Sequence, residues 1–142
     1  MSKKGRVDME QARALIVEDN EENLCLLEAF LHKCNFTIST VRNGQEAVDA
    51  VRLATDRGGR FDIILMDLKM PIMDGYIATK IIREMEMEKG LLAQPILALT
   101  ANSGVVVQTD LIKEGFDQVL FKPIDQHTLL TIIQGFLMGG LH

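Results

Sequence analysis

The fold is decided by the segment Ile63-Ile64-Leu65-Met66-Asp67, in which four consecutive apolar residues run directly into a carboxylate. A short unbroken apolar run is typical of a strand buried on both faces, as in a parallel sheet covered by helices. In open sheets of this kind the reactive groups stand just beyond the carboxyl ends of the strands. The segment therefore predicts an α/β fold and makes Asp67 a candidate for the chemistry.

Short apolar runs alternate along the whole chain with longer segments of helical spacing. The predicted strands are Ala14–Val17, Thr37–Val41, Ile63–Met66, Ile96–Thr100 and Val119–Phe121. Each helical segment carries an apolar stripe that repeats every three or four residues and should face the core. The stripes are Leu24, Leu27 and Leu31; Ala47, Val51 and Ala54; Ile77, Ile81 and Met85; and Leu129, Ile132, Ile133 and Phe136. The alternation predicts five βα units, with helices covering both faces of one parallel sheet.

Residues that begin and end helices stand at fitting positions. Four side chains can cap a helix N-terminus, namely Asn20, Asn43, Asp74 and Asp125. Glu46 follows Asn43 at the spacing of a capping box, and Gly90 and Gly115 stand where two helices would end. These signals predict the boundaries of the helices.

The fourth helix, expected over residues 103–114, has the least regular pattern because Val105, Val106 and Val107 are consecutive and β-branched. Three neighbouring residues cannot all face the core from one helical turn, so we expect at least one of them to be exposed. Two interpretations stay open for this run. It is either a well-buried helix start or an apolar patch for a partner or for self-association.

Length and composition predict one folded domain. The chain has 142 residues, 47% hydrophobic and 25% charged, which we divide into a polar leader at 1–12, a domain at 13–138 and a tail at 139–142. A net charge of −5 and the lack of a dense basic stripe disfavour direct nucleic-acid binding. No apolar run approaches the roughly 20 residues that span a bilayer, so we expect a cytoplasmic protein without membrane insertion.

Polar side chains follow four of the predicted strands. Glu18 and Asp19 follow the first, Asp67 follows the third, Thr100 ends the fourth and Lys122 follows the fifth. Clustered carboxylates repel one another unless a cation lies among them, and their hard oxygen atoms suit Mg²⁺. Lys122 could neutralise a phosphoryl group in transfer and Thr100 could donate a hydrogen bond to it, which would leave Asp67 as a carboxylate nucleophile.

Taken singly, each of these residues has an ordinary structural interpretation. Glu18 and Asp19 could serve as charges at a helix N-terminus, Asp67 as a loop residue, Thr100 as a strand end and Lys122 as a surface cation. Cys25 and Cys34, nine positions apart, match neither a zinc site nor a disulfide framework. His32, His127 and His142 lie away from the strand ends and are expected to be solvated or cap residues.

The segments around the strand ends decide between these interpretations. They read Leu15-Ile16-Val17-Glu18-Asp19-Asn20, Leu65-Met66-Asp67-Leu68-Lys69-Met70-Pro71-Ile72-Met73-Asp74-Gly75, Leu99-Thr100-Ala101-Asn102 and Phe121-Lys122-Pro123-Ile124. Together they resemble the receiver domains of two-component response regulators, with all four motifs in order over about residues 13–138. The resemblance implies a doubly wound, flavodoxin-like three-layer sandwich with strand order 2-1-3-4-5.

The resemblance also implies a role for each site residue. Asp67 would accept phosphate from a phosphohistidine, and Mg²⁺ would be bound by Asp19, Asp67 and the backbone carbonyl of Lys69, with Glu18 acting through water. Lys122 would contact the phosphoryl oxygens and precede a cis peptide bond to Pro123. Thr100 would carry the change to the surface of the fourth helix, the fifth strand and the fifth helix.

The same resemblance implies partners and a regulatory character. The donor would be a sensor histidine kinase or a histidine-phosphotransfer protein, and the output would be a downstream effector protein or a relayed phosphate, with a phosphorylation-dependent homodimer left open. The chain would not be an enzyme on other substrates and would catalyse only its own phosphoryl transfer and dephosphorylation. Whether it stands alone or was cut from a hybrid kinase stays open.

One position departs from the family pattern. Many receivers have Tyr or Phe three residues before the active-site lysine, where this chain has Val119. Phe121 shares a strand face with Val119 by the two-residue period, so it is a candidate substitute whose equivalence stays open. This departure keeps a second hypothesis alive, in which the chain is an interaction module that is no longer phosphorylated.

A hydrolase of the phosphatase or dehalogenase type is the remaining alternative, since it also uses a strand-end aspartate on a similar sheet. Those enzymes place a second Asp two residues after the nucleophile, where this chain has Lys69. The sequence also lacks a long insertion that could form a substrate-enclosing cap. Both observations favour a receiver-like phosphoacceptor over a hydrolase.

Overall fold

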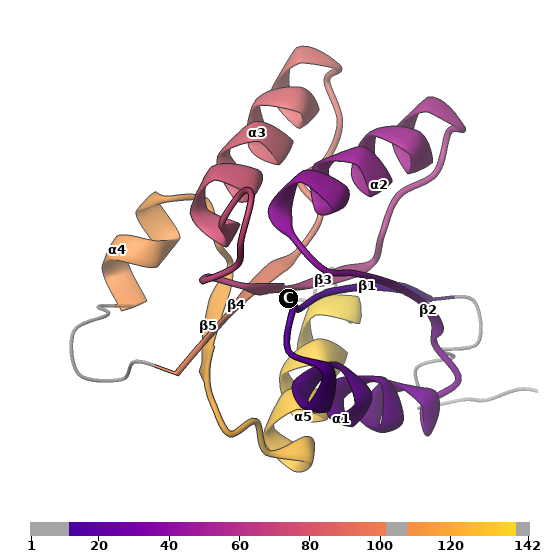
Figure 1. Ribbon diagram of the computed structural model, residues 1–142. Helices are drawn as coiled ribbons and strands as arrows, with labels where there is room; N and C mark the ends of the chain where they lie inside the picture. The colour runs from indigo at the N-terminus through magenta and orange to yellow at the C-terminus, as the bar shows by residue number, and fades with distance from the viewer. Residues whose placement is uncertain (1–11, 102–107, 139–142) are drawn as a thin grey trace, which may run out of the picture.

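The computed structural model describes residues 12–101 and 108–138, in which strands and helices alternate strictly (Figure 1). In chain order the elements are β1 (Arg13–Val17), α1 (Glu21–His32), β2 (Thr37–Val41), α2 (Gly44–Asp56), β3 (Ile63–Asp67), α3 (Gly75–Glu88), β4 (Ile96–Thr100), α4 (Gln108–Lys113), β5 (Gln118–Phe121) and α5 (Gln126–Leu137). Each predicted strand agrees with the structure to within one residue at either end. The predicted α/β fold is confirmed.

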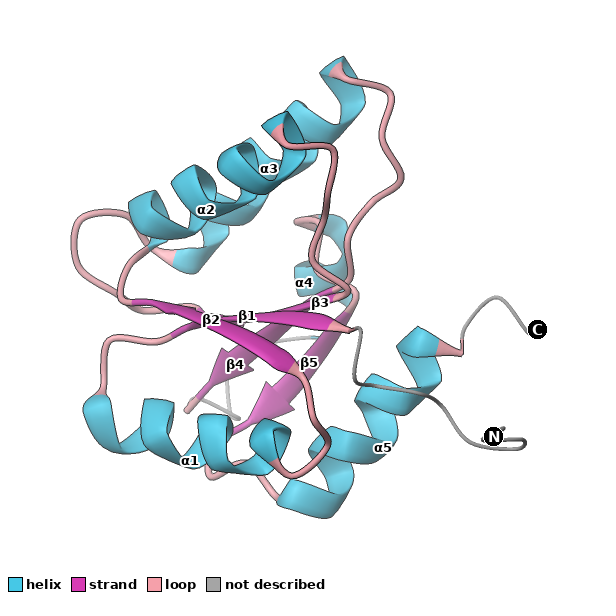
Figure 2. Ribbon diagram, turned by 90° about the vertical axis from the view of Figure 1, so that its right-hand side faces the viewer, coloured by secondary structure: helices cyan, strands magenta, loops and turns pink. Residues whose placement is uncertain are grey.

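The sheet has the expected order β2-β1-β3-β4-β5, and all neighbouring strands run parallel. Figure 2 shows α1 and α5 on one face of the sheet and α2, α3 and α4 on the other. Successive residues of β3 point to opposite faces, so Ile63 and Leu65 join the core under α1 and α5, whereas Ile64 and Met66 join the core under α2 and α3. This burial on both faces explains why β3 is apolar throughout.

The four predicted N-caps are all present. The side chains of Asn20, Asn43, Asp74 and Asp125 each accept a hydrogen bond from the backbone N–H three residues on. The capping box differs in one detail, since the Glu46 carboxylate accepts from the N–H of Arg42 (2.8 Å) rather than from that of Asn43. The loop before α2 is therefore fixed one residue further out than the motif predicts.

The predicted core stripe of α3 is confirmed at Met85, holds only in part at Ile81 and is wrong at Ile77. Ile77 is 50% exposed and Ile81 is only partly buried, whereas Ala78, Ile82 and Met85 face the core. The cause is the start of the helix, where a Cβ on Gly75 would collide with the carbonyl oxygen of Asp67. This close approach brings the small side chain of Ala78 onto the sheet and turns the larger Ile77 outward.

The end of α4 agrees with its prediction, and its start cannot be compared. Gly115 follows the helix with φ +111° and Gly90 follows α3 with φ +64°, both in the region that favours glycine. Residues 102–107, which include Asn102 and the Val105–Val107 run, lie outside the described residues. No helix in the described ranges is both long and apolar enough to cross a membrane.

A buried hydroxyl stands out on α3. Thr79 is fully buried, and no hydrogen-bond partner for its Oγ1 is found within residues 12–101 and 108–138. A buried polar group left unpaired costs about 1–3 kcal/mol. The unpaired hydroxyl of Thr79 therefore lowers the stability of the protein where α3 packs toward Gly115.

Thr79→Val is expected to raise the free energy of unfolding by about 1 kcal/mol, because it removes the unpaired hydroxyl and keeps both the shape and a similar helix propensity. Urea unfolding of the variant and the parent chain measures the difference. Thr79→Ser is the matched control, since it keeps the hydroxyl, loses the methyl group and should destabilise. A Thr79→Val variant less stable than the parent would mean that the hydroxyl has a partner.

Candidate functional site

The strand ends bring the predicted site residues to one rim of the sheet. In the register of the sheet Val17 lies beside Met66, Asp67 beside Leu99, and Thr100 beside Phe121. Glu18 and Asp19 follow β1, and Lys122 follows β5. Because parallel strands end at a common edge, side chains from four strands meet there although they are up to about 100 positions apart in the sequence.

Three carboxylates form the centre of this site. Glu18 is fully buried, Asp67 is 6% exposed and Asp19 is exposed, yet one oxygen from each lies within 4.8 Å of the others. The Lys122 ammonium lies 3.0 Å from Glu18 Oε1 and 3.4 Å from Asp67 Oδ2. Lys122 therefore supplies one positive charge where three negative charges gather.

Glu18 shows where a further cation would fit. Its Oε2 accepts a hydrogen bond from the backbone N–H of Asn20 at 3.2 Å. Its Oε1 is buried and forms an ion pair with Lys122, but no hydrogen bond reaches it from the described parts of the chain. An acceptor with lone pairs left over, beside two further carboxylates, is a suitable environment for a hard divalent ion.

The charge balance is visible in the pKa of Asp67, which rises from 3.8 to about 6. The largest cause is burial, followed by the neighbouring carboxyl group of Glu18. Lys122 and the backbone N–H of Lys69, which lies 3.3 Å from Asp67 Oδ1, lower the pKa but do not compensate. The residues present thus fit Mg²⁺, because a bound cation would favour the ionised carboxylate.

A cavity of about 400 Å³ opens over Asp67. Its lining residues are Asn20, Asn23, Asp67, Leu68, Lys69, Thr100, Ala101 and Lys122. Asn23 is a residue that the sequence reasoning missed, and its position one turn after Asn20 on α1 is the signal that could have found it. Of the histidines and cysteines in the described ranges, none lines this cavity.

The loop from β3 to α3 holds the rim on one side of the cavity. Pro71 and Met73 close a tight turn, with Met73 N–H donating to Pro71 O at 2.7 Å, which leaves the central residue Ile72 at φ +69° and 82% exposed. A β-branched residue at positive φ is strained, and such strain is concentrated at functional sites. Met70 and Met73 pack against the core.

On the other side the chain enters α5 through the predicted cis bond, which is present between Lys122 and Pro123. Thr100 closes β4 at 5% exposure, and its carbonyl accepts from the N–H of Lys122 at 2.8 Å. Val119 is 5% exposed, whereas Phe121 is 41% exposed. The two residues that share a strand face therefore differ in burial.

Comparisons with known proteins agree with this geometry. A sequence profile of the response regulator receiver domain matches residues 14–134. Hybrid signal transduction histidine kinase A of Dictyostelium discoideum is 42% identical over 82% of this chain, and the sensor protein GacS of Pseudomonas syringae pv. syringae is 37% identical over 85% of it. The chain spans only 5% and 13% of the lengths of these two relatives.

Solved structures give the same result. One is a co-crystal structure of the Saccharomyces cerevisiae histidine phosphotransfer protein Ypd1 with the receiver domain of Ssk1, which matches with a TM-score of 0.80 and 32% identity over 94% of each chain. Another is the receiver domain of a sensor histidine kinase from Pseudomonas aeruginosa with magnesium in its active-site cleft. It matches with a TM-score of 0.76 and 33% identity, covering 89% of this chain and 98% of that one.

Asp67→Asn is expected to stabilise the metal-free protein at pH 8. The ordinary pKa of the carboxyl group is 3.8, and its pKa in the folded state is about 6. Between these two pH values the folded state keeps a proton that the unfolded state has released, so the free energy of unfolding falls as the pH rises. The uncharged amide of the variant removes the cost of ionising a buried carboxyl group. The free energy of unfolding should therefore rise by about 1–2 kcal/mol, after allowance for solvent screening.

Urea unfolding in the presence of a chelator at pH 8 and pH 5 measures the effect, which should be larger at pH 8. Asp49→Asn, with its side chain 61% exposed on α2, is the control and should change little. A gain from Asp67→Asn that is equal at both pH values would contradict the assigned cause.

Proposed function

The chain belongs to the response regulator receiver domain family, and we propose that it is a signalling switch in which Asp67 accepts a phosphoryl group from a phosphohistidine. The observation that carries the proposal is a buried carboxylate that faces an open cavity, with an ammonium 3.4 Å away and two more carboxylates beside it. This arrangement supplies a nucleophile, a cation for the transferred group and oxygen ligands for a metal.

The transfer exchanges one bond to phosphorus for another. The bond between phosphorus and the donor imidazole nitrogen breaks, a bond to one oxygen of ionised Asp67 forms, and the imidazole leaves with its electron pair. The Lys122 ammonium lies close enough to Asp67 to neutralise phosphoryl oxygens in the cavity. Thr100, at the same rim, offers a hydroxyl to those oxygens.

Glu18, Asp19, Asp67 and the backbone carbonyl of Lys69 are the groups that would hold Mg²⁺. When bound, the ion would supply positive charge that keeps Asp67 ionised and offsets the charge of the phosphoryl oxygens. The direct role of Asp19 is supported by its exposure, since it can reach both solvent and the two buried carboxylates. Glu18 is buried behind them, which suits a contact through water.

The partners follow from the reaction and from the relatives. A phosphohistidine donor is either a sensor histidine kinase or a histidine-phosphotransfer protein, and the Ypd1–Ssk1 receiver complex is an example of the second kind. On the output side, the surface of α4, β5 and α5 would bind an effector protein or a second copy of the chain, or the phosphate would be relayed further. We place the working domain at residues 13–138, in the cytoplasm, without direct nucleic-acid binding.

The switch is favoured over a hydrolase acting on other substrates. Lys69 occupies the position two residues after Asp67 where hydrolases of the phosphatase type place an acid, and it lines the cavity. We therefore propose that the chain catalyses only its own phosphorylation and dephosphorylation. Repeated release of phosphate from an added phosphoester would contradict this.

Incubation with Mg²⁺ and a small phosphodonor is expected to add one phosphoryl group to the chain and none to Asp67→Asn, as measured by intact mass. Asp74→Asn is a matched control from the same loop, because Asn caps the N-terminus of α3 as well as Asp does. It should be phosphorylated like the parent chain. A parent chain that gains no mass in Mg²⁺ would sink the proposal.

Lys69→Ala is expected to change the lifetime of phosphorylated Asp67 by about threefold or more, with a smaller change in Mg²⁺ affinity, because the side chain lines the approach to the phosphoryl group while its backbone is retained. The loss of acid-labile phosphate with time and a Mg²⁺ titration measure the two quantities. Asn102, outside the described residues, is expected to act in the same way. Equal lifetimes in the variants and the parent would count against the assignment.

A further inference from the structure

Helix α3 begins against the phosphoacceptor. The N–H of Gly75 donates to the carbonyl of Leu68 at 3.0 Å, and Gly75 packs so closely on the carbonyl of Asp67 that no side chain would fit between them. The helix then continues for 14 residues, about 20 Å at 1.5 Å per residue. A helix of this length moves as a rigid unit, so its two ends share any displacement.

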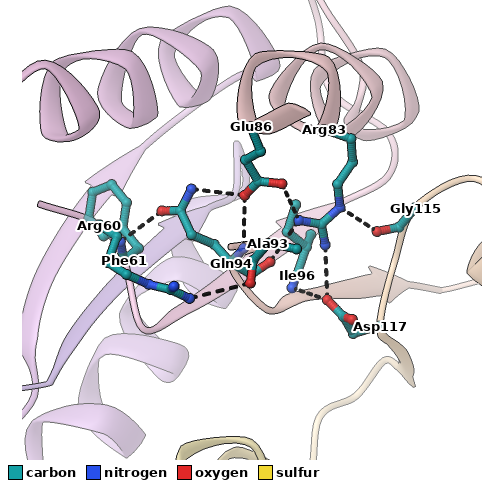
Figure 3. Close-up of polar contacts among 9 residues, drawn as sticks. All are labelled: Arg60, Phe61, Arg83, Glu86, Ala93, Gln94, Ile96, Gly115 and Asp117. Atoms are coloured by element: carbon teal, nitrogen blue, oxygen red, sulfur yellow. Dashed lines mark hydrogen bonds and ion pairs between the residues drawn. The ribbon is translucent and has the colours of Figure 1, made fainter. Parts of the chain in front are cut away.

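The second half of α3 is fastened to the connection between α4 and β5. Arg83, with its side chain 18% exposed, donates from Nε to the carbonyl of Gly115 at 2.9 Å and from Nη2 to Asp117 Oδ2 at 2.9 Å (Figure 3). A Cβ on Gly115 would lie 3.1 Å from Arg83 Cγ and 3.3 Å from Thr79 Cγ2. The connection is thus fitted closely to this face of the helix.

The third nitrogen of the Arg83 guanidinium is also hydrogen-bonded. Its Nη1 donates to Glu86 Oε1 and to the carbonyl of Gln94, each at 2.8 Å. Glu86 is 3% exposed, and its Oε2 accepts from the backbone N–H and the side-chain amide of Gln94 at 2.8 and 3.0 Å. Because a guanidinium with bonds on every nitrogen has a fixed orientation, Arg83 is a rigid link.

The network also reaches the starts of two strands. Asp117 Oδ2 accepts from the N–H of Ile96 at 2.9 Å, while the N–H of Asp117 donates to the carbonyl of Ile96 at 2.8 Å. At the other end of α3, Tyr76 packs edge-to-face on Phe116, with ring centroids 6.0 Å apart. Residues 115–117 therefore contact both the first turn and the second half of α3.

We propose that α3 carries a change at Asp67 to the connection between α4 and β5 at residues 114–117, and that Arg83 is the positioning residue that transmits it. The proposal rests on the proposed function, since it requires Asp67 to accept a phosphoryl group. The physical basis is a single rigid element with one end on the carbonyl of Asp67 and two directed hydrogen bonds to the connection.

Fluoroberyllate with Mg²⁺, used as a mimic of the phosphoryl group, tests the link in the full chain. Binding is followed by ¹⁹F NMR, and the response of the connection is followed by the backbone amide shifts of residues 114–117. In the parent chain we expect binding together with shifts at these amides. Arg83→Lys keeps a cation beside Glu86 but cannot bond both Gly115 and Asp117. It should bind the mimic and lose more than about half of the shift at residues 114–117.

Two further variants make the result specific. Asp117→Asn keeps an acceptor for the N–H of Ile96 but loses the charge that pairs with Arg83. Like Arg83→Lys, it should reduce the amide shifts that the mimic induces at residues 114–117. Arg52→Lys, at an exposed ion pair on α2, should respond like the parent chain. A merely structural role of Arg83 would lower stability without changing the shift that the mimic induces.

The outcomes separate the proposal from the function on which it rests. A parent chain that does not bind fluoroberyllate overturns both. Binding without amide shifts at residues 114–117 overturns the coupling and leaves the phosphoacceptor assignment standing. Shifts of equal size in Arg83→Lys and the parent chain overturn the role of Arg83.

Discussion

Two carboxylates that are buried next to each other constrain the rest of this structure. Glu18 and Asp67 lose solvation and repel each other, so the fold must bring positive charge to the same place. Lys122 provides it with Nζ at 3.0 and 3.4 Å from the two groups. The pKa of Asp67 stays raised at about 6 despite this ammonium, which means that the protein alone does not complete the neutralisation.

The position of that ammonium depends on β5, which stands at the edge of the sheet in the described residues and pairs there with β4. Backbone bonds between Asp117 and Ile96 at one end, and between Lys122 and Thr100 at the other, fix the register of the two strands. Since Asp117 also binds Arg83, the charge balance at the carboxyl ends of the strands is linked to a partly buried polar network at their amino ends.

The parts that the sequence predicts correctly are those with a local or periodic signal. The strands are continuous apolar runs and the N-caps are single residues in fixed positions, so both are readable without tertiary information. The prediction for Ile77 was wrong because the contact of Gly75 with Asp67 sets the rotation of α3 at its start. The bonds of Arg83 to Gly115 and Asp117 span 32 and 34 positions, and no period in the sequence marks such pairs.

Val119 bears on how the switch works. It is buried and small, so β5 offers no aromatic ring at the position where many receivers have one, and Phe121 is exposed instead. The aromatic contact on this side of the sheet is formed by Tyr76 of α3 with Phe116, just before β5. In a close-packed interior an aromatic side chain reorients only if its neighbours move, so the positions of these two rings are coupled. In the coupling proposed above, Tyr76 and Arg83 of α3 link Asp67 to the α4–β5 connection without passing through Val119.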